Sequence, residues 1–200
     1  MTILVAAPTY EGKDYARANY LACYEAFTYP DKRLFLVDNT PGTLAYARKL
    51  RGLGVECEHV EPLPDFWDTM ELCWRAIVCR AHELDCEYIA SIEADVLCPP
   101  QTLEVLLEHV DHHGLVSHGV PECDAFHFPS WCLGCVLTRT DRLYDSRFLW
   151  TGSIEMFMYT GNDGTMPLLK NLLDIQHLHS GGEPGWQGAG EGKVFGSGRG

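Results

Sequence analysis

Tyr88-Ile89-Ala90-Ser91-Ile92-Glu93-Ala94-Asp95 joins a short apolar run to two carboxylates. The run before Glu93 predicts a buried strand of a parallel sheet. Glu93 and Asp95 then lie where that strand reaches the surface. Carboxylate oxygens suit Mg²⁺ or Mn²⁺, which usually bind through one or two carboxylates together with substrate phosphates. The segment therefore indicates a divalent-metal site, although two acidic residues can also be ordinary polar groups at a strand end.

Strand-like and helix-like segments alternate on both sides of this stretch. Apolar runs at 3–7 and 34–37, and alternation of apolar and polar residues at 55–60, predict further strands. In residues 70–81 the apolar side chains recur at helical spacing along one continuous face. Strands that alternate with helices through short connections predict an α/β fold, a single domain with a mostly parallel, Rossmann-like sheet flanked by helices. The predicted helices are 15–27, 44–53, 70–81 and one that follows Pro99 and Pro100.

Three polar clusters follow predicted strands. They are Pro8-Thr9-Tyr10, Asp38-Asn39 and Glu93-Ala94-Asp95. The carboxyl ends of parallel strands meet at one edge of the sheet, and ligands of such sheets bind there. We therefore expect the three clusters to converge on one site.

Length and charge limit the classes of function. The 200 residues suit one domain with a full core. The 15 Lys and Arg against 28 Asp and Glu give a formal net charge of −13, which argues against a broad electrostatic grip on nucleic acid or on an anionic membrane. No stretch approaches the roughly 20 apolar residues of a membrane span. The first residues lack a basic leader and the nine cysteines are odd in number, so we expect a cytoplasmic protein with reduced thiols.

The pattern becomes more strand-like after residue 114. Residues 115–120 and 133–138 predict strands, and 168–173 predict a short helix. Residues 180–200 contain nine glycines, which indicates a flexible tail.

The order of the motifs resembles that of a small glycosyltransferase of the GT-A fold, in the broad family-two-like group. Pro8-Thr9-Tyr10-Glu11 is similar to the first-strand loop that packs on the nucleotide, and Leu36-Val37-Asp38-Asn39 to the second-strand motif whose Asp contacts the base or ribose. Ile92-Glu93-Ala94-Asp95 stands at the position of the DxD motif, with Glu in place of the first Asp. Gly161-Asn162-Asp163-Gly164 resembles the acidic motif that carries the acceptor-activating base, and His177-Leu178-His179 the late metal-binding histidine.

This resemblance implies a metal-dependent, inverting transfer of a sugar from a nucleotide sugar to a hydroxyl group, with UDP as the expected nucleotide. Mn²⁺ or Mg²⁺ would be the cofactor. The acceptor stays open among a small molecule, a glycan, a lipid-linked group, a protein and a modified nucleic-acid base. Residues 1–114 would form the nucleotide-sugar-binding half, 115–180 the acceptor and catalytic half of the same domain, and 181–200 the Gly-rich tail.

The resemblance also implies a role for particular side chains. Asp95 would bind the metal directly, and Glu93 would act through water or on the ribose. His177 or His179 would complete the metal ligands. Alternation in an extended segment turns both side chains the same way, so both stay candidates. Asp163 would accept the proton of the acceptor hydroxyl. The residues expected to bind the nucleotide sugar are Pro8, Thr9, Tyr10, Glu11, Asp38, Asn39, Arg75, Glu93, Ala94 and Asp95.

The chain departs from the family pattern in two further places. Many members carry Arg-Asn where this chain has Trp74-Arg75, and a Glu-Asp pair where it has Asn162-Asp163. Plainer interpretations also stand beside the functional ones. Asp163 and Asp38 are natural turn formers, and the two histidines can be ordinary residues at a strand end.

Other classes of function remain as alternatives. A nucleotidyltransferase has a related fold, but its Gly-rich, Lys-containing first loop matches Pro8–Lys13 poorly. A non-catalytic nucleotide-sugar-binding protein would bind without turnover and tolerate Asp163→Asn. Cys132-Leu133-Gly134-Cys135 could indicate zinc or redox chemistry. Because the sequence has no second Cys-x-x-Cys pair, core packing is the favoured role of these cysteines.

Overall fold

The computed structural model describes residues 1–110, 115–118, 134–143, 168–169 and 173–178. The helical elements are η1 (Glu11–Lys13), α1 (Arg17–Ala26), α2 (Ala45–Gly52), α3 (Phe66–Glu83), α4 (Thr102–His109) and α5 (Thr140–Leu143). The strands are β1 (Ile3–Thr9), β2 (Lys32–Asp38), β3 (Glu56–His59), β4 (Tyr88–Ile92), β5 (Val96–Leu97), β6 (Leu115–His118), β7 (Cys135–Arg139), β8 (Leu168–Leu169) and β9 (Gln176–His177).

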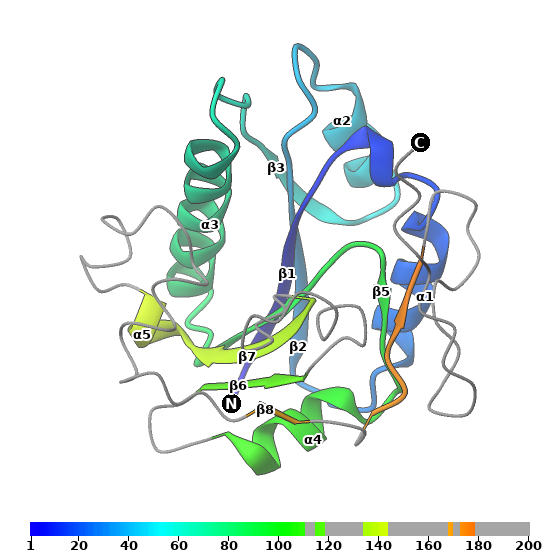
Figure 1. Ribbon diagram of the computed structural model, residues 1–200, viewed down its shortest axis with the longest axis vertical. Coiled ribbons are helices and arrows are strands. Elements are labelled where there is room, and N and C mark those ends of the chain that lie inside the picture. Colours follow the sequence, from blue (N-terminus) through cyan, green and yellow to red (C-terminus); the bar gives the residue numbers. More distant parts are fainter. Residues whose placement is uncertain (111–114, 119–133, 144–167, 170–172, 179–200) are drawn as a thin grey trace, which may run out of the picture.

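Seven of these strands form one sheet in the order β3-β2-β1-β4-β7-β6-β8. The first four run parallel, whereas β7 is antiparallel to both β4 and β6. Figure 1 shows α3 on one side of the sheet and α1 and α2 on the other. The predicted α/β fold, with a mostly parallel sheet between helices, is confirmed.

The sheet separates two hydrophobic cores, because successive side chains of a strand point to opposite faces. In β1, Ile3, Val5 and Ala7 join the core under α1, α2 and α4, whereas Leu4 and Ala6 join the core under α3. All five side chains are fully buried. Burial on both faces explains why the sequence shows unbroken apolar runs in its strands instead of alternation.

A second, two-stranded sheet pairs β5 with β9 in antiparallel register. The sequence did not predict either of these short strands. The helix predicted for 168–173 is wrong at its start, since Leu168–Leu169 form β8, parallel to β6. An apolar pair this short has no periodicity that separates helix from strand, so pairing with β6 decides. Among the described helices, none combines the length and the apolar character that a membrane crossing needs.

Candidate metal and nucleotide site

Glu93 and Asp95 lie in a tight turn between β4 and β5, which we call the acidic turn (93–95). The Val96 N–H donates to the Glu93 carbonyl at 2.9 Å, which closes the turn. Tyr20 of α1, only 2% exposed, donates its hydroxyl to the Ile92 carbonyl at 3.1 Å. These bonds fix the acidic turn at the carboxyl end of β4, the edge at which ligands of such sheets bind.

β9 brings His177 to the acidic turn from a distant part of the sequence. His177 pairs with Val96, and the Leu178 N–H donates to the Asp95 carbonyl at 2.7 Å. His177 Nε2 lies 3.4 Å from Asp95 Oδ2. One ligand atom each from Glu93, Asp95 and His177 all lie within 4.8 Å of one another. The structure thus brings together three of the four residues named as metal ligands, while His179 lies outside the described residues.

The donor set of this group fits a divalent ion. Two carboxylates and an imidazole suit Mn²⁺ in particular, because the ligands mix oxygen with nitrogen. Asp95 is 5% exposed. Its burial opposes ionisation, but the hydrogen bond from His177 and the charge of Lys13 lower its pKa to about 2. Asp95 is therefore ionised at neutral pH, as a metal ligand must be.

Sequence reasoning missed two residues that contact the same carboxylate, Lys13 and Tyr15. Lys13 Nζ lies 2.8 Å from Asp95 Oδ1 and 3.5 Å from Glu93 Oε2. The Tyr15 hydroxyl lies 3.2 Å from both Asp95 Oδ2 and the Leu178 carbonyl oxygen, and its single proton can be shared between these two acceptors. Burial, and then the charge of Asp95, raises the pKa of Tyr15 to about 12, so the hydroxyl keeps its proton. Their position in the sequence could have indicated them, because both residues closely follow β1 and so lie near the ligand-binding edge of the sheet.

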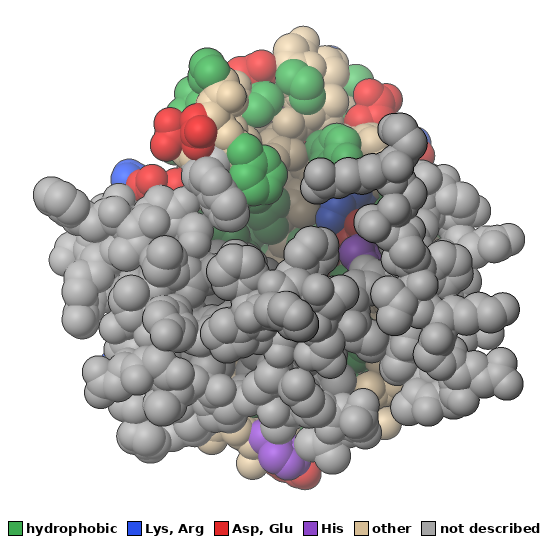
Figure 2. All heavy atoms as spheres, viewed as in Figure 1, with side chains coloured by type: hydrophobic (Ala, Val, Ile, Leu, Met, Phe, Trp, Pro, Cys, Tyr) green, Lys and Arg blue, Asp and Glu red, His purple; other side chains and the backbone are tan. Residues whose placement is uncertain are grey.

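Side chains of these kinds meet on the molecular surface. Figure 2 shows basic, acidic and histidine side chains next to one another on the face that it displays. Burial, which lowers the pKa of Lys13, is outweighed by the charges of Glu93 and Asp95, so the pKa of Lys13 rises. Lys13 is therefore positively charged at neutral pH.

Asp38, at the end of β2, is fully buried and bonded within the chain. Its Oδ1 accepts from the Thr40 N–H at 3.0 Å and from the Thr40 hydroxyl at 2.6 Å. Its Oδ2 accepts from the Ala47 N–H at 3.2 Å and lies 2.9 Å from His59 Nδ1. This is the turn-forming role of an Asx residue. A contact of Asp38 with the nucleotide stays a prediction.

The loop after β1 is tied to the loop after β2. The Glu11 N–H donates to the Thr40 hydroxyl oxygen at 2.8 Å, and the Asn39 N–H donates to the Thr9 carbonyl at 2.8 Å. Thr9 is 2% exposed, whereas Tyr10 is 46% exposed. Tyr10 is thus an accessible aromatic ring at the predicted nucleotide-binding edge.

The remaining predicted residues lie in several places. Pro8 is half-buried within β1, and Ala94 is buried in the acidic turn. Arg75 lies on the exposed side of α3, where its Nη2 and Nε lie 2.6 and 3.0 Å from Glu71 Oε1. Its nearest described partner is therefore on its own helix, and contact with a base stays a prediction. Asp163, the predicted base, lies outside the described residues.

Cys135 of the Cys-x-x-Cys segment is buried in the core, and its Sγ lies 4.0 Å from Cys98 Sγ. The hydrogen bond with Cys135, followed by burial, raises the pKa of Cys98 well above its usual range. Buried thiols of this kind pack as small hydrophobic groups. Cys132 lies outside the described residues.

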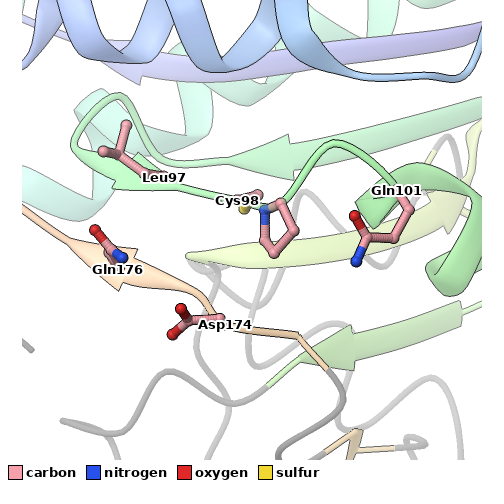
Figure 3. A pocket seen from close by; sticks show the side chains of 6 residues that line it. Leu97, Cys98, Gln101, Asp174 and Gln176 are labelled. Carbon is pink, nitrogen blue, oxygen red and sulfur yellow. The ribbon is translucent and has the colours of Figure 1, made fainter. Parts of the chain in front are cut away.

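A pocket of about 540 Å³ opens beside β5 and β9 (Figure 3). Leu97 and Gln176 form the pair next to Val96 and His177, and neighbouring residues of a strand point to opposite faces. His177 is not among the described residues that line the pocket. The lining residues are Leu97, Cys98, Pro99, Gln101, Asp174 and Gln176.

No protein-family model matches this chain, and no curated protein matches it significantly in sequence. Solved structures nevertheless share its arrangement. TarS from S. aureus overlays with a TM-score of 0.57 at 17% identity, over 86% of this chain and 35% of TarS. The chain thus spans about a third of that protein.

Two ligand complexes also match. TarS 1–349 in complex with UDP has a TM-score of 0.56 at 18% identity, over 85% of this chain and 57% of that one. Glucosyl-3-phosphoglycerate synthase from Mycobacterium tuberculosis, solved with Mn²⁺, UDP and glucosyl-3-phosphoglycerate, has a TM-score of 0.55 at 12% identity, over 84% of this chain and 69% of that one. Likeness at such low identity reports the fold. The chain therefore has the GT-A fold that its sequence resemblance predicted.

Proposed function

We propose that this protein is a metal-dependent glycosyltransferase that moves a sugar, with inversion, from a UDP-sugar to a hydroxyl acceptor. The observation that carries the proposal is the meeting of Glu93, Asp95 and His177 at the carboxyl end of β4. Structures with the same fold were solved in complex with UDP, and one of them also contains Mn²⁺. These complexes support a nucleotide diphosphate as the group that approaches the acidic turn.

Each residue of the site has a defined task under this proposal. Asp95 and His177 would hold the metal, and Glu93 would assist directly, through water or on the ribose. A divalent ion bound there supplies a Lewis acid for the negative charge that develops on the diphosphate. Asp163 would accept the proton of the acceptor hydroxyl on the opposite side of the sugar, which is the one base that inversion needs.

The first test is thermal stabilisation by UDP and other nucleoside diphosphates, with and without Mn²⁺. UDP should raise the unfolding midpoint when Mn²⁺ is present, and Asp95→Asn should remove that rise. Glu87→Gln is the matched control, because Glu87 is exposed just before the opposite end of β4. If no nucleotide shifts the midpoint of metal-loaded wild type, the proposal fails.

Turnover separates the transferase from the alternatives. Release of UDP from a UDP-sugar, measured by chromatography with a panel of acceptors, is the expected result. Asp163→Asn should abolish that release and leave the affinity for UDP unchanged. Pyrophosphate released from UTP and a sugar phosphate would instead indicate a nucleotidyltransferase. Tight binding of UDP-sugars, without release of UDP in the presence of any acceptor, would indicate a binding protein.

A further inference from the structure

The side chain of Lys13 reaches from the turn after β1 to the acidic turn after β4. Its Nζ atom lies 2.8 Å from Asp95 Oδ1 and 3.5 Å from Glu93 Oε2. The Lys13 side chain is 22% exposed and that of Asp95 is 7% exposed, so water and salt screen this pair only partly. A positive charge supplied by the chain itself therefore contacts both carboxylates of the predicted metal site.

A divalent ion held by Glu93, Asp95 and His177 would compete with Lys13 for the same two carboxylates. Two cations that contact one buried carboxylate repel each other strongly, because the interior screens charge less than water does. The ammonium of Lys13 must therefore withdraw when the ion enters. Lysine permits this movement, because its charge is compact and sits on a flexible four-carbon chain.

We propose that Lys13 holds the cation position of the acidic turn until metal binds, and then moves onto the diphosphate of the nucleotide sugar. This inference rests on the proposed function. A displaced ammonium without a new partner makes metal binding to the nucleotide-free protein weaker. The diphosphate supplies that partner, so metal and nucleotide each strengthen the binding of the other.

The charges around Lys13 support this assignment. Its neighbour Asp14 already binds Arg17 Nε at 2.8 Å and Lys49 Nζ at 2.7 Å. Among the described ion pairs, Lys13 is the lysine or arginine that reaches Glu93 and Asp95. The chain has a net charge of −13, which repels an anionic ligand. The positive charge of Lys13 at the ligand-binding edge would offset this repulsion for a diphosphate.

The test compares two affinities in the same protein. Titration calorimetry measures Mn²⁺ binding to nucleotide-free protein, and then UDP binding in saturating Mn²⁺. Lys13→Met should bind Mn²⁺ at least tenfold more tightly than wild type and UDP at least tenfold more weakly. Lys49→Met is the matched control, since it removes the same charge from a lysine that binds Asp14, and both of its affinities should equal those of wild type. Opposite changes are the signature, because loss of a purely structural ion pair would weaken both.

Unchanged Mn²⁺ affinity in Lys13→Met, or a weakening of both affinities, would overturn the inference. If Lys13→Met does not fold, Lys13→Arg replaces it. A guanidinium holds a carboxylate through two bonds, so this variant should bind Mn²⁺ more weakly than wild type, and equal or tighter binding would overturn the inference. Wild-type protein that binds no nucleotide in Mn²⁺ ends the proposed function as well. Wild-type protein that binds both, with Lys13→Met indistinguishable from it, ends this inference alone.

Discussion

Nδ1 of His59 lies 2.9 Å from Oδ2 of the buried Asp38, which fastens the end of β3 to the end of β2. The other ring nitrogen, Nε2, lies 3.3 Å from Glu61 Oε2. Burial acts to lower the pKa of His59, but the hydrogen bonds with Asp38 and Glu61 outweigh it and raise that pKa. The imidazolium form is thus favoured between two carboxylates.

This pair predicts that part of the stability depends on pH. The pKa of His59 is higher in the folded than in the unfolded protein, where it is about 6.5. Its contribution is therefore complete below about pH 6.5 and is lost as pH rises through the folded-state pKa. The melting temperature of wild type should exceed that of His59→Gln at pH 6, and the gap should narrow by pH 9. His109→Gln, on an exposed residue of α4, is the control. A gap that is constant with pH would contradict the prediction.

The hydroxyl of Tyr20 should matter more than that of its neighbour Tyr24. Tyr20→Phe leaves the Ile92 carbonyl, next to the acidic turn, without its partner at 3.1 Å. We expect a loss of about 1–2 kcal/mol in unfolding free energy, measured by urea denaturation. Tyr24→Phe removes a longer bond, of 3.4 Å to the Lys32 carbonyl, and should cost less. Equal losses in the two variants would contradict the prediction that the bond to Ile92 contributes more stability than the bond to Lys32.

Asp85, which follows α3, has a φ of 54°, in the left-handed region. In this region the Cβ atom of a residue lies too close to the backbone carbonyl oxygen. Glycine has no Cβ atom and avoids this strain. Asp85→Gly should therefore raise the unfolding free energy by up to about 1 kcal/mol, whereas Asp85→Ala should not. Urea denaturation of the two variants beside wild type checks this. A glycine variant less stable than wild type would mean that the Asp85 side chain contributes more than its backbone costs.

The cysteines should differ in reactivity. Cys79 is exposed, whereas Cys98 and Cys135 are buried and close to each other. Because the thiolate is the reactive form, the raised pKa of Cys98 protects it further. Iodoacetamide should label Cys79 at least tenfold faster than Cys98 or Cys135 in the native protein, as read by peptide mapping. Labelling in urea provides the control, since all three should then react alike.

The parallel part of the sheet and its helices could be predicted because each element shows a hydrophobic pattern within its own residues. β4 is an unbroken apolar run, and α3 places its apolar side chains on one face, so each segment predicts its own structure. The antiparallel pairing of β7 with β4 could not be predicted from the sequence. Strand order depends on pairing between segments that are distant in sequence, and no pattern within residues 133–138 specifies a neighbour.

The candidate site divides in the same way. Glu93 and Asp95 were predicted because they follow a buried strand, and His177 was predicted together with His179 because of the order of the motifs. Lys13 and Tyr15 were missed because their bonds to Asp95 span 82 and 80 residues and leave no periodic trace. The internal hydrogen bonding of Asp38 could not be predicted either. Its four contacts form only when the loop after β2, helix α2 and strand β3 meet at one carboxylate.

The pairing of β9 with β5 has a consequence for biosynthesis. His177 lies 82 residues after Asp95, so a ribosome working at about 5–20 residues per second makes it roughly 4–16 s later. During that interval a nascent chain can build β1 to β4 with both carboxylates and Lys13 in place, yet without the imidazole. Under the proposed function, the complete set of candidate metal ligands would therefore form only after the late strand has been translated and has paired with β5.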